Sequence, residues 1–499
     1  MSSDDIEKAE EGQETAPQSN AFGNVKSAFG AIAKRCSTEP FVPPPNSYGG
    51  SIACIPASAV IKDLVKRQEL ITRIGQCLLW YGAPAYYVEE ILEAVAQALY
   101  VPASFAYRIG RINCMFTNLD GKSSNGIQIL EAESWNIKKL ELVFRVFTDI
   151  VNDKISVTTA ALEIERIIEK SDLSRWIRIP VFAFAAASLG PFAFGGRWVD
   201  AVIVSILGLV VGILQMVVYP KREDIATLSI AINTIVSSFI AAGINARTQE
   251  SVCLPALAQA SIALTLPGYP MLIGTIELLS TRNIQAGSAR MLFAIIWSYI
   301  FAFGIGNAFT LYRLFDAKAT FSNFEGCEME KPLWSTFSMA VSFIVCVQII
   351  NKASIKQTAV GFVLGMAGFA TQFGMNKWTG WPQLSSFIGA FLVTAVGSIH
   401  TRWFRGLGWA TMLPGILLQV PAGLLAEGGM ASGLRMVDTV FNQGKNEFAN
   451  MGFKESVLEN GFTVVEICVA VALGIMAGGS VTYLGTGGKK NRKERLWSF

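Results

Sequence analysis

The feature that most constrains this chain is a series of apolar stretches that fills its last two thirds, each long enough to cross a bilayer. A helix needs roughly 20 apolar residues to span the hydrocarbon core of a membrane. Charged residues make up 16% of the chain, against about 25% in soluble domains. We therefore expect a polytopic α-helical membrane protein rather than a soluble all-helical one. The ten predicted spans cover residues 178–195, 201–219, 225–244, 252–273, 291–312, 333–350, 357–374, 382–399, 407–426 and 462–484.

Basic residues predict how the spans are oriented, since short cytoplasmic loops carry an excess of lysine and arginine. With the residues before the first span in the cytosol, each inside loop holds two basic residues and each short outside loop holds one. The tail at 485–499 adds a basic run from Lys489 to Arg495. We expect an integral, multi-pass protein with both termini cytosolic, in a plasma or vacuolar membrane that the sequence does not distinguish. The inside residues are Lys221, Arg222, Arg282, Arg290, Lys352, Lys356, Arg402 and Arg405, and the outside ones are Arg197, Arg247 and Lys377.

Two segments of different composition precede the spans. Residues 1–60 are acidic at first and then pass through Pro43-Pro44-Pro45, a composition typical of a disordered tail. No basic, apolar signal peptide opens the chain. Residues 61–172 combine helical periodicity with extended segments around a plausible hairpin turn at Asp120-Gly121. We expect a small cytosolic α+β domain there.

Short motifs in this domain and in the fourth span resemble those of a known family. They are Tyr81-Gly82-Ala83-Pro84 with Val88-Glu89-Glu90, Leu99-Tyr100-Val101-Pro102-Ala103, Phe147-Thr148-Asp149-Ile150-Val151 and Leu266-Pro267-Gly268-Tyr269-Pro270. Through them the chain resembles the threonine/serine exporter-like family, most closely its fungal branch of the pheromone-regulated membrane protein 10 type. The resemblance covers about residues 65–485. It implies a cytosolic N-terminal domain followed by ten spans, and the bacterial members are associated with threonine and serine export.

The sequence departs from the family pattern at two places in the domain. Tyr86-Tyr87 stands where relatives often carry His-Arg, and Asn152 stands where a histidine is expected. Roles that depend on those basic side chains do not carry over to this chain.

Leu-Pro sequences in the fourth and ninth spans predict breaks in both helices. Proline lacks a backbone donor and clashes with the preceding turn, so Pro267 with Pro270, and Pro414 with Pro421, should interrupt their helices. Non-helical backbone at membrane depth is tolerated only inside protein or beside a water-filled cavity. A lone Pro-Gly is more often a simple kink, and that alternative remains open.

The two breaks occupy matching positions in two sets of five spans, 178–312 and 333–484. Repeats of an odd number of spans must run oppositely across the membrane, as in the inverted repeats of many secondary transporters. We therefore expect two inverted five-helix repeats, with the breaks facing one another near the membrane middle.

The predicted substrate-binding residues lie at and near these breaks. Ionisable residues in or near spans are costly in lipid and are often functional, which makes Glu277 and Glu466 candidates for ion coupling. The alternatives are an ordinary cytosolic helix end for Glu277 and the outer interface for Glu466. The substrate-binding candidates are Pro267, Gly268, Tyr269, Pro270, Glu277, Pro414, Gly415, Gln419 and Pro421.

Several classes of site are not supported by the sequence. The single histidine is His400, and the eight cysteines form no Cys-x-x-Cys pair, so neither a structural zinc site nor a disulfide framework is predicted. No Walker-type loop appears, and no cofactor is expected. A net charge of +3 is too small to suggest a nucleic-acid partner. Residues 1–399 hold no histidine, which excludes a Ser-His or Cys-His dyad there.

These observations predict a secondary transporter rather than an enzyme. Its partners would be the lipid bilayer and a small neutral amino acid such as threonine or serine, and a homo-oligomer remains open. The alternative is a non-transporting membrane protein with a role in mating, fusion or scaffolding.

Overall fold

The structure is a computed structural model, and the contacts discussed below all lie within one compact unit that begins at Lys66. The predicted tail up to residue 56, the Asp120-Gly121 turn, Pro421 and the basic C-terminal tail lie outside the described residues. Those residues are 57–117, 124–130, 135–226, 228–248, 252–280, 283–316, 319, 321, 327, 332–404, 408–419 and 448–484.

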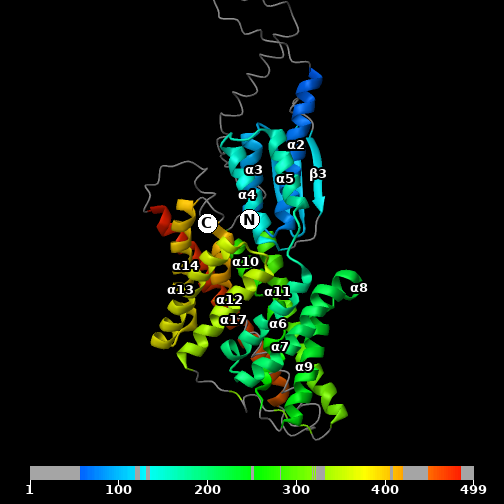
Figure 1. Cartoon of the computed structure of the whole chain (residues 1–499), viewed down its shortest axis with the longest axis vertical. Coiled ribbons are helices and arrows are strands. Elements are labelled where there is room, and N and C mark those ends of the chain that lie inside the picture. The colour runs from blue at the N-terminus through cyan, green and yellow to red at the C-terminus, as the bar shows by residue number, and fades with distance from the viewer. Residues whose placement is uncertain are drawn as a thin grey trace, which may run out of the picture. The chain divides into compact units, whose positions relative to one another are not determined.

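Residues 66–172, here called the N-terminal domain, combine helices with a three-stranded antiparallel sheet in the order β1-β2-β3. Figure 1 shows these elements in blue to cyan. Ile112, Cys114 and Phe116 alternate along β2 and are fully buried, so one face of the sheet contributes to the domain core. The elements are α2 Ala57–Trp80, which begins before the domain, α3 Ala85–Ala98, β1 Ala103–Arg108, β2 Arg111–Thr117, β3 Ser124–Leu130, α4 Ile137–Val151 and α5 Val157–Glu169.

Local signals in the sequence fix where these helices begin and end. Gly82 adopts a φ of 79° in the turn between α2 and α3, a conformation that glycine reaches without strain. The side chain of Asn136 accepts a hydrogen bond from Lys139 N at 3.1 Å and caps α4. The Ser156 hydroxyl accepts one from Thr159 N at 3.2 Å and caps α5. Such caps satisfy amide groups that a helix start leaves without intrahelical partners.

Eight helices in the described part of the chain are long and apolar enough to cross a membrane, which makes this a polytopic α-helical membrane protein. The two predicted spans missing from that set are the fourth and the ninth, the two that carry Leu-Pro. The first half of the bundle contains α6 Arg175–Ala193, α7 Trp198–Ile213, α9 Ser229–Arg247 and α11 Ile284–Phe315. The second half contains α12 Leu333–Ile350, α13 Ile355–Thr379, α14 Pro382–Phe404, α15 Gly408–Leu417 and α17 Phe448–Leu484.

Tryptophans mark the ends of these helices. Six exposed indoles lie close to the ends of candidate spans, where aromatic belts occupy the boundary between membrane and water. Large apolar side chains along the helices are exposed as well, as expected of surfaces that face lipid. The indoles belong to Trp176, Trp198, Trp334, Trp378, Trp381 and Trp403.

Glycines let the third and fifth helices of each half approach closely. In the first half a Cβ added to Gly304 of α11 would lie 2.8 Å from Thr234 of α9. In the second half a Cβ on Gly478 of α17 would lie 2.7 Å from the Phe391 carbonyl oxygen of α14. Small residues serve this purpose in membrane helix pairs. The two halves therefore share one packing device, while the complete ten-helix inverted repeat stays a prediction.

One disulfide that the sequence analysis did not predict joins Cys253 to Cys327 across 74 positions. It ties the start of the fourth predicted span to the segment after α11. Scattered single cysteines gave no spacing signal, because the two partners come together only through the packing of several helices. Among the described residues, no group of three or more histidine, cysteine or acidic side chains could hold a metal ion.

Candidate functional site

The fourth span is broken, as predicted, and the irregular stretch begins earlier than Pro267. A π-helical turn, η4 Ala256–Ala260, is followed by a 3-10 turn, η5 Ala263–Thr265. Leu266 is then extended, with φ −67° and ψ 145°, the conformation favoured before proline. Helix α10 starts at Gly268 and runs to Leu279. Residues Ala256 to Ala263 are buried, which fits the rule that such backbone is enclosed by protein or lines a cavity.

Pro414 does not itself break its helix, contrary to the prediction, while Pro421, the second proline of that predicted break, lies outside the described residues. Pro414 lies inside α15, which continues to Leu417, and Leu418 N donates to the Pro414 carbonyl at 3.3 Å. The next residue, Gly415, lies close to α13, since a Cβ added to it would lie 3.0 Å from the Gly365 Cα. Neighbouring helices help membrane helices to tolerate proline.

The two Leu-Pro segments have different main neighbours. Helix α10 packs chiefly on α11 and α17, and α15 packs chiefly on α13 and α14. Tyr269, in the first turn of α10, lies edge-on against Trp135 of the N-terminal domain, with ring centroids 4.0 Å apart. The first break therefore lies beside that domain. That the two breaks face one another stays a prediction.

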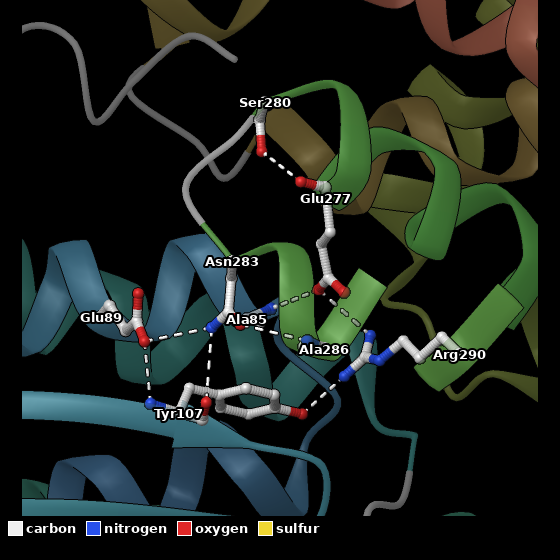
Figure 2. A network of polar contacts seen from close by, with 8 residues as sticks. All are labelled: Ala85, Glu89, Tyr107, Glu277, Ser280, Asn283, Ala286 and Arg290. Carbon is white, nitrogen blue, oxygen red and sulfur yellow. Dashed lines mark hydrogen bonds and ion pairs between the residues drawn. The ribbon is translucent and has the colours of Figure 1, made fainter. Parts of the chain in front are cut away.

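Glu277, in the last turns of α10, is fully buried. Its Oε1 accepts a hydrogen bond from Ala85 N of the N-terminal domain at 3.1 Å and lies 3.4 Å from Nη1 of Arg290 in α11. Nη2 of Arg290 in turn donates to the Tyr107 hydroxyl at 2.5 Å. Figure 2 shows these side chains converging from α10, α11 and the N-terminal domain. Glu277 is thus an internal ion-pair partner rather than an ordinary exposed helix end.

A second set of bonds extends this network. Glu89 Oε1 accepts from Tyr107 N at 2.8 Å and from Asn283 Nδ2 at 3.1 Å. The Asn283 side chain also caps α11 by accepting from Ala286 N at 3.2 Å (Figure 2). The motif residues around Pro84 and Glu89 therefore meet the loop that joins α10 to α11.

Tyr86 lies in the same region and remains protonated over the physiological pH range. Burial raises its pKa well above the ordinary tyrosine value, and the neighbouring Tyr87, Tyr269, Glu277 and Glu90 raise it further. A neutral phenol therefore lies near Glu277, at a position where the family pattern often has a basic side chain.

A second polar contact joins the N-terminal domain and its linker to the second half. Ile137 N donates to the Asn351 carbonyl at 3.2 Å, and Gln357 Nε2 donates to the Ile137 carbonyl at 3.5 Å. Asp172, which precedes α6, lies 2.5 Å from Lys352 Nζ and 3.3 Å from Lys139 Nζ. Burial alone would raise the Asp172 pKa, but hydrogen bonds and charge from Lys352, and then from Lys139, bring it below its usual value.

The remaining predicted residues lie apart from this network. Glu466 is exposed on α17 and accepts from Gln383 Nε2 at 3.0 Å, so its coupling role stays a prediction. Gln419 is buried, and Gly368 and Gly389 both approach its side chain closely.

Sequence reasoning did not single out Arg290, Tyr107, Asn283, Asp172 or Lys352 as site residues. Arg290 offered a signal, because a charged side chain at the edge of an apolar stretch usually has a partner. The others are ordinary loop and strand residues, and their partners are distant in sequence.

Comparison with known families agrees with this architecture. A family model described as a putative threonine/serine exporter matches residues 69–312, and one described as threonine/serine exporter matches residues 333–481. The chain belongs to the threonine/serine exporter-like family. Within this family it is of the pheromone-regulated membrane protein 10 type. It is therefore an integral membrane protein of an exporter-type family.

Curated relatives with similar sequences come from fungi. An uncharacterised protein of Schizosaccharomyces pombe is 30% identical over 446 residues, which is 88% of this chain and 58% of the relative. Pheromone-regulated membrane protein 10 of Eremothecium gossypii is 30% identical over 425 residues, 85% of this chain and 57% of the relative. The same-named protein of Saccharomyces cerevisiae is 28% identical over 85% of this chain and 55% of the relative. The chain thus spans somewhat more than half the length of these relatives. No solved structure matches it.

Proposed function

We propose that this chain is a secondary transporter that exports small neutral amino acids of the threonine and serine type. The observation that carries the proposal is the fourth span, in which a buried π-turn, a 3-10 turn and an extended Leu266 separate two apolar segments. Broken membrane helices of this kind form the binding sites of many secondary transporters. The family matches over both halves support the same class of protein.

The chemistry of the broken segment suits an amino acid. The amides that open α10 carry the partial positive charge of a helix start and can receive a carboxylate. Gln259 and Ser261 are fully buried in the irregular stretch, and the Ser261 hydroxyl is hydrogen-bonded to that of Ser237 in α9. We propose that residues 266–270 form the substrate site together with these polar side chains, and that residues 413–419, which are helical up to Leu417, complete it from the second half.

In this conformation the Glu277 carboxylate is paired with the guanidinium of Arg290. The carboxylate therefore contacts the protein and not the amine of a substrate. We propose that Glu277 takes part in transport through this ion pair, and that Glu466 remains a second candidate for coupling. Neither role requires a cofactor or a catalytic step.

The disulfide supports the predicted orientation. Cys253 opens the fourth span and Cys327 lies in the segment after α11, both on the side that the loop charges assign to the outside. Disulfides persist in oxidising compartments and are rare in the cytosol. We therefore propose that the N-terminal domain and both termini are cytosolic.

A role in mating, fusion or scaffolding without transport is the alternative, which the names of the pheromone-regulated relatives keep open. An efflux assay separates the two. Proteoliposomes that contain the purified full chain and are loaded with radiolabelled threonine or serine should release the label faster than protein-free liposomes with the same load. If the protein is folded but the flux of neither amino acid exceeds that of the protein-free liposomes, the alternative is favoured.

A further inference from the structure

One short segment of the N-terminal domain contacts both halves of the membrane bundle. Trp135 packs edge-on against Tyr269, directly after the break in the first half. Two residues later, Ile137 N bonds to the Asn351 carbonyl, in the loop between α12 and α13 of the second half. Any rearrangement between the halves must therefore strain or break one of these contacts.

The contact with the first half is the stronger of the two. It comprises the hydrogen bonds and the ion pair that link Ala85, Tyr107, Glu277 and Arg290 (Figure 2). The Glu89 carboxylate adds hydrogen bonds from Asn283 and from the Tyr107 backbone. The Glu277 side chain is 0% exposed and that of Arg290 is 9% exposed. Separating a buried, hydrogen-bonded charge from its partners is strongly unfavourable, so the domain, α10 and the start of α11 should move together.

The contact with the second half is weaker. Apart from two bonds to the Ile137 backbone, one of them buried, it depends on the ion pair of Asp172, whose side chain is 39% exposed, with Lys352, whose side chain is 14% exposed. An ion pair with one partner partly open to solvent contributes less to stability than a fully buried pair. Water can replace these bonds when the α12–α13 loop moves away.

We propose that during the transport cycle the N-terminal domain stays attached to α10 and α11 and separates from the α12–α13 loop, with Asp172 and Lys352 as the latch that closes this gap. The inference rests on the proposed function, since a secondary transporter alternates between two arrangements of its halves. It assigns the domain a mechanical role, because the domain would move as one rigid unit with α10, the helix that follows the break.

Spin labels on the full chain in lipid nanodiscs test the separation without any need for transport. One pair, Lys138→Cys with Ile355→Cys, reports the contact with the second half. The matched pair, Arg108→Cys with Ile284→Cys, reports the contact with the first half. All four positions are exposed, and Cys36 and Cys54 are replaced by serine in both proteins so that they take no label.

Pulsed electron paramagnetic resonance should give two distance populations for the first pair and one for the second. The Asp172→Asn substitution should raise the longer population of the first pair by about two- to fivefold, the scale of one partly exposed ion pair. Asp149→Asn, which removes the exposed pair with Lys154 inside the domain, should leave both distributions unchanged.

A single population for the Lys138–Ile355 pair, unchanged by Asp172→Asn and by added threonine and serine, would overturn the proposal. So would a second population for the Arg108–Ile284 pair, because the domain would then leave both halves. If the separation is seen but no amino acid flux can be measured, the proposed substrate fails while the movement of the domain stands.

Discussion

The buried carboxylate of Glu277 accepts a hydrogen bond from the backbone amide of Ala85, 192 positions earlier in the chain, at 3.1 Å. Glu277 belongs to the helix that follows the membrane break, and Ala85 is the first residue of α3, directly after the Gly-Ala-Pro motif. The bond therefore joins the helices that follow two of the motifs resembling the exporter family. This bond fixes the N-terminal domain to the part of the membrane bundle where we place transport.

The buried ion pair at this bond should be important for stability. Arg290→Met should lower the free energy of unfolding by about 3–5 kcal/mol, because it leaves the Glu277 carboxylate buried without its cation. Glu277→Gln combined with Arg290→Met should lose much less, since no unpaired charge remains. Denaturant unfolding in detergent measures both. Glu163→Gln, at an exposed pair with Arg166, is the control and should change little. Equal losses for the single and double variants would contradict the ion-pair account.

Close packing between α10 and α11 should make Gly287 intolerant of a side chain. A Cβ there would lie 2.8 Å from Leu278 N and 2.9 Å from the Gly274 carbonyl oxygen, so Gly287→Ala should push the helices apart and destabilise the protein by about 1–3 kcal/mol. Gly374→Ala on α13 is the matched control, because nothing lies within 4 Å of its added Cβ. The control should be neutral or slightly stabilising, since alanine favours helix. Thermal unfolding of the two variants side by side would refute this packing if Gly287→Ala melted like the wild type.

The Asp172 latch should respond to acid but not to pH changes near neutrality. The pKa of Asp172 in the folded protein lies below the ordinary aspartate value of 3.8. Its contribution to stability is therefore present above that pH and is lost as pH falls through the lowered pKa. The stability difference between wild type and Asp172→Asn should be constant from pH 5 to pH 8 and should shrink toward zero below about pH 4. Unfolding curves of both proteins across this range provide the measurement, and a difference that disappears between pH 5 and pH 8 would exclude this assignment.

The disulfide gives a direct test of orientation. In intact cells that carry the protein in their plasma membrane, a membrane-impermeant maleimide should label Cys327 only after treatment with an impermeant reductant. Cys327→Ser with Cys253→Ser is the control and should remove that labelling. A cysteine at Lys356 should be labelled only after the cells are made permeable. Labelling of Lys356→Cys in intact cells would reverse the predicted topology.

The membrane helices were largely predictable, because span length and hydropathy are local properties. The span expected at 333–350 is observed as Leu333–Ile350, and the break at Pro267 follows from the local chemistry of proline. What the sequence did not predict depends on distant packing. Pro414 lies inside a helix whose next residue, Gly415, packs closely on Gly365 of α13, and Cys253 meets Cys327 through the packing of several helices.

The same reason explains the candidate site. Tyr269 and Glu277 were singled out from sequence, but their contacts with Trp135, Ala85 and Arg290 come from segments whose proximity no local pattern reveals. The sequence therefore indicated Tyr269 and Glu277 as candidates, and the structure shows that residues of the N-terminal domain contact both side chains.

The central claim is that the broken fourth span carries transport, and threonine efflux from proteoliposomes tests it most directly. Pro267→Ala removes the proline that favours the extended conformation of Leu266, so α10 can join the preceding 3-10 turn, and efflux should fall at least about tenfold at equal protein content. Ser480→Ala, at an exposed position on α17, should leave efflux unchanged. Folded Pro267→Ala protein that exports threonine at the wild-type rate would contradict the account.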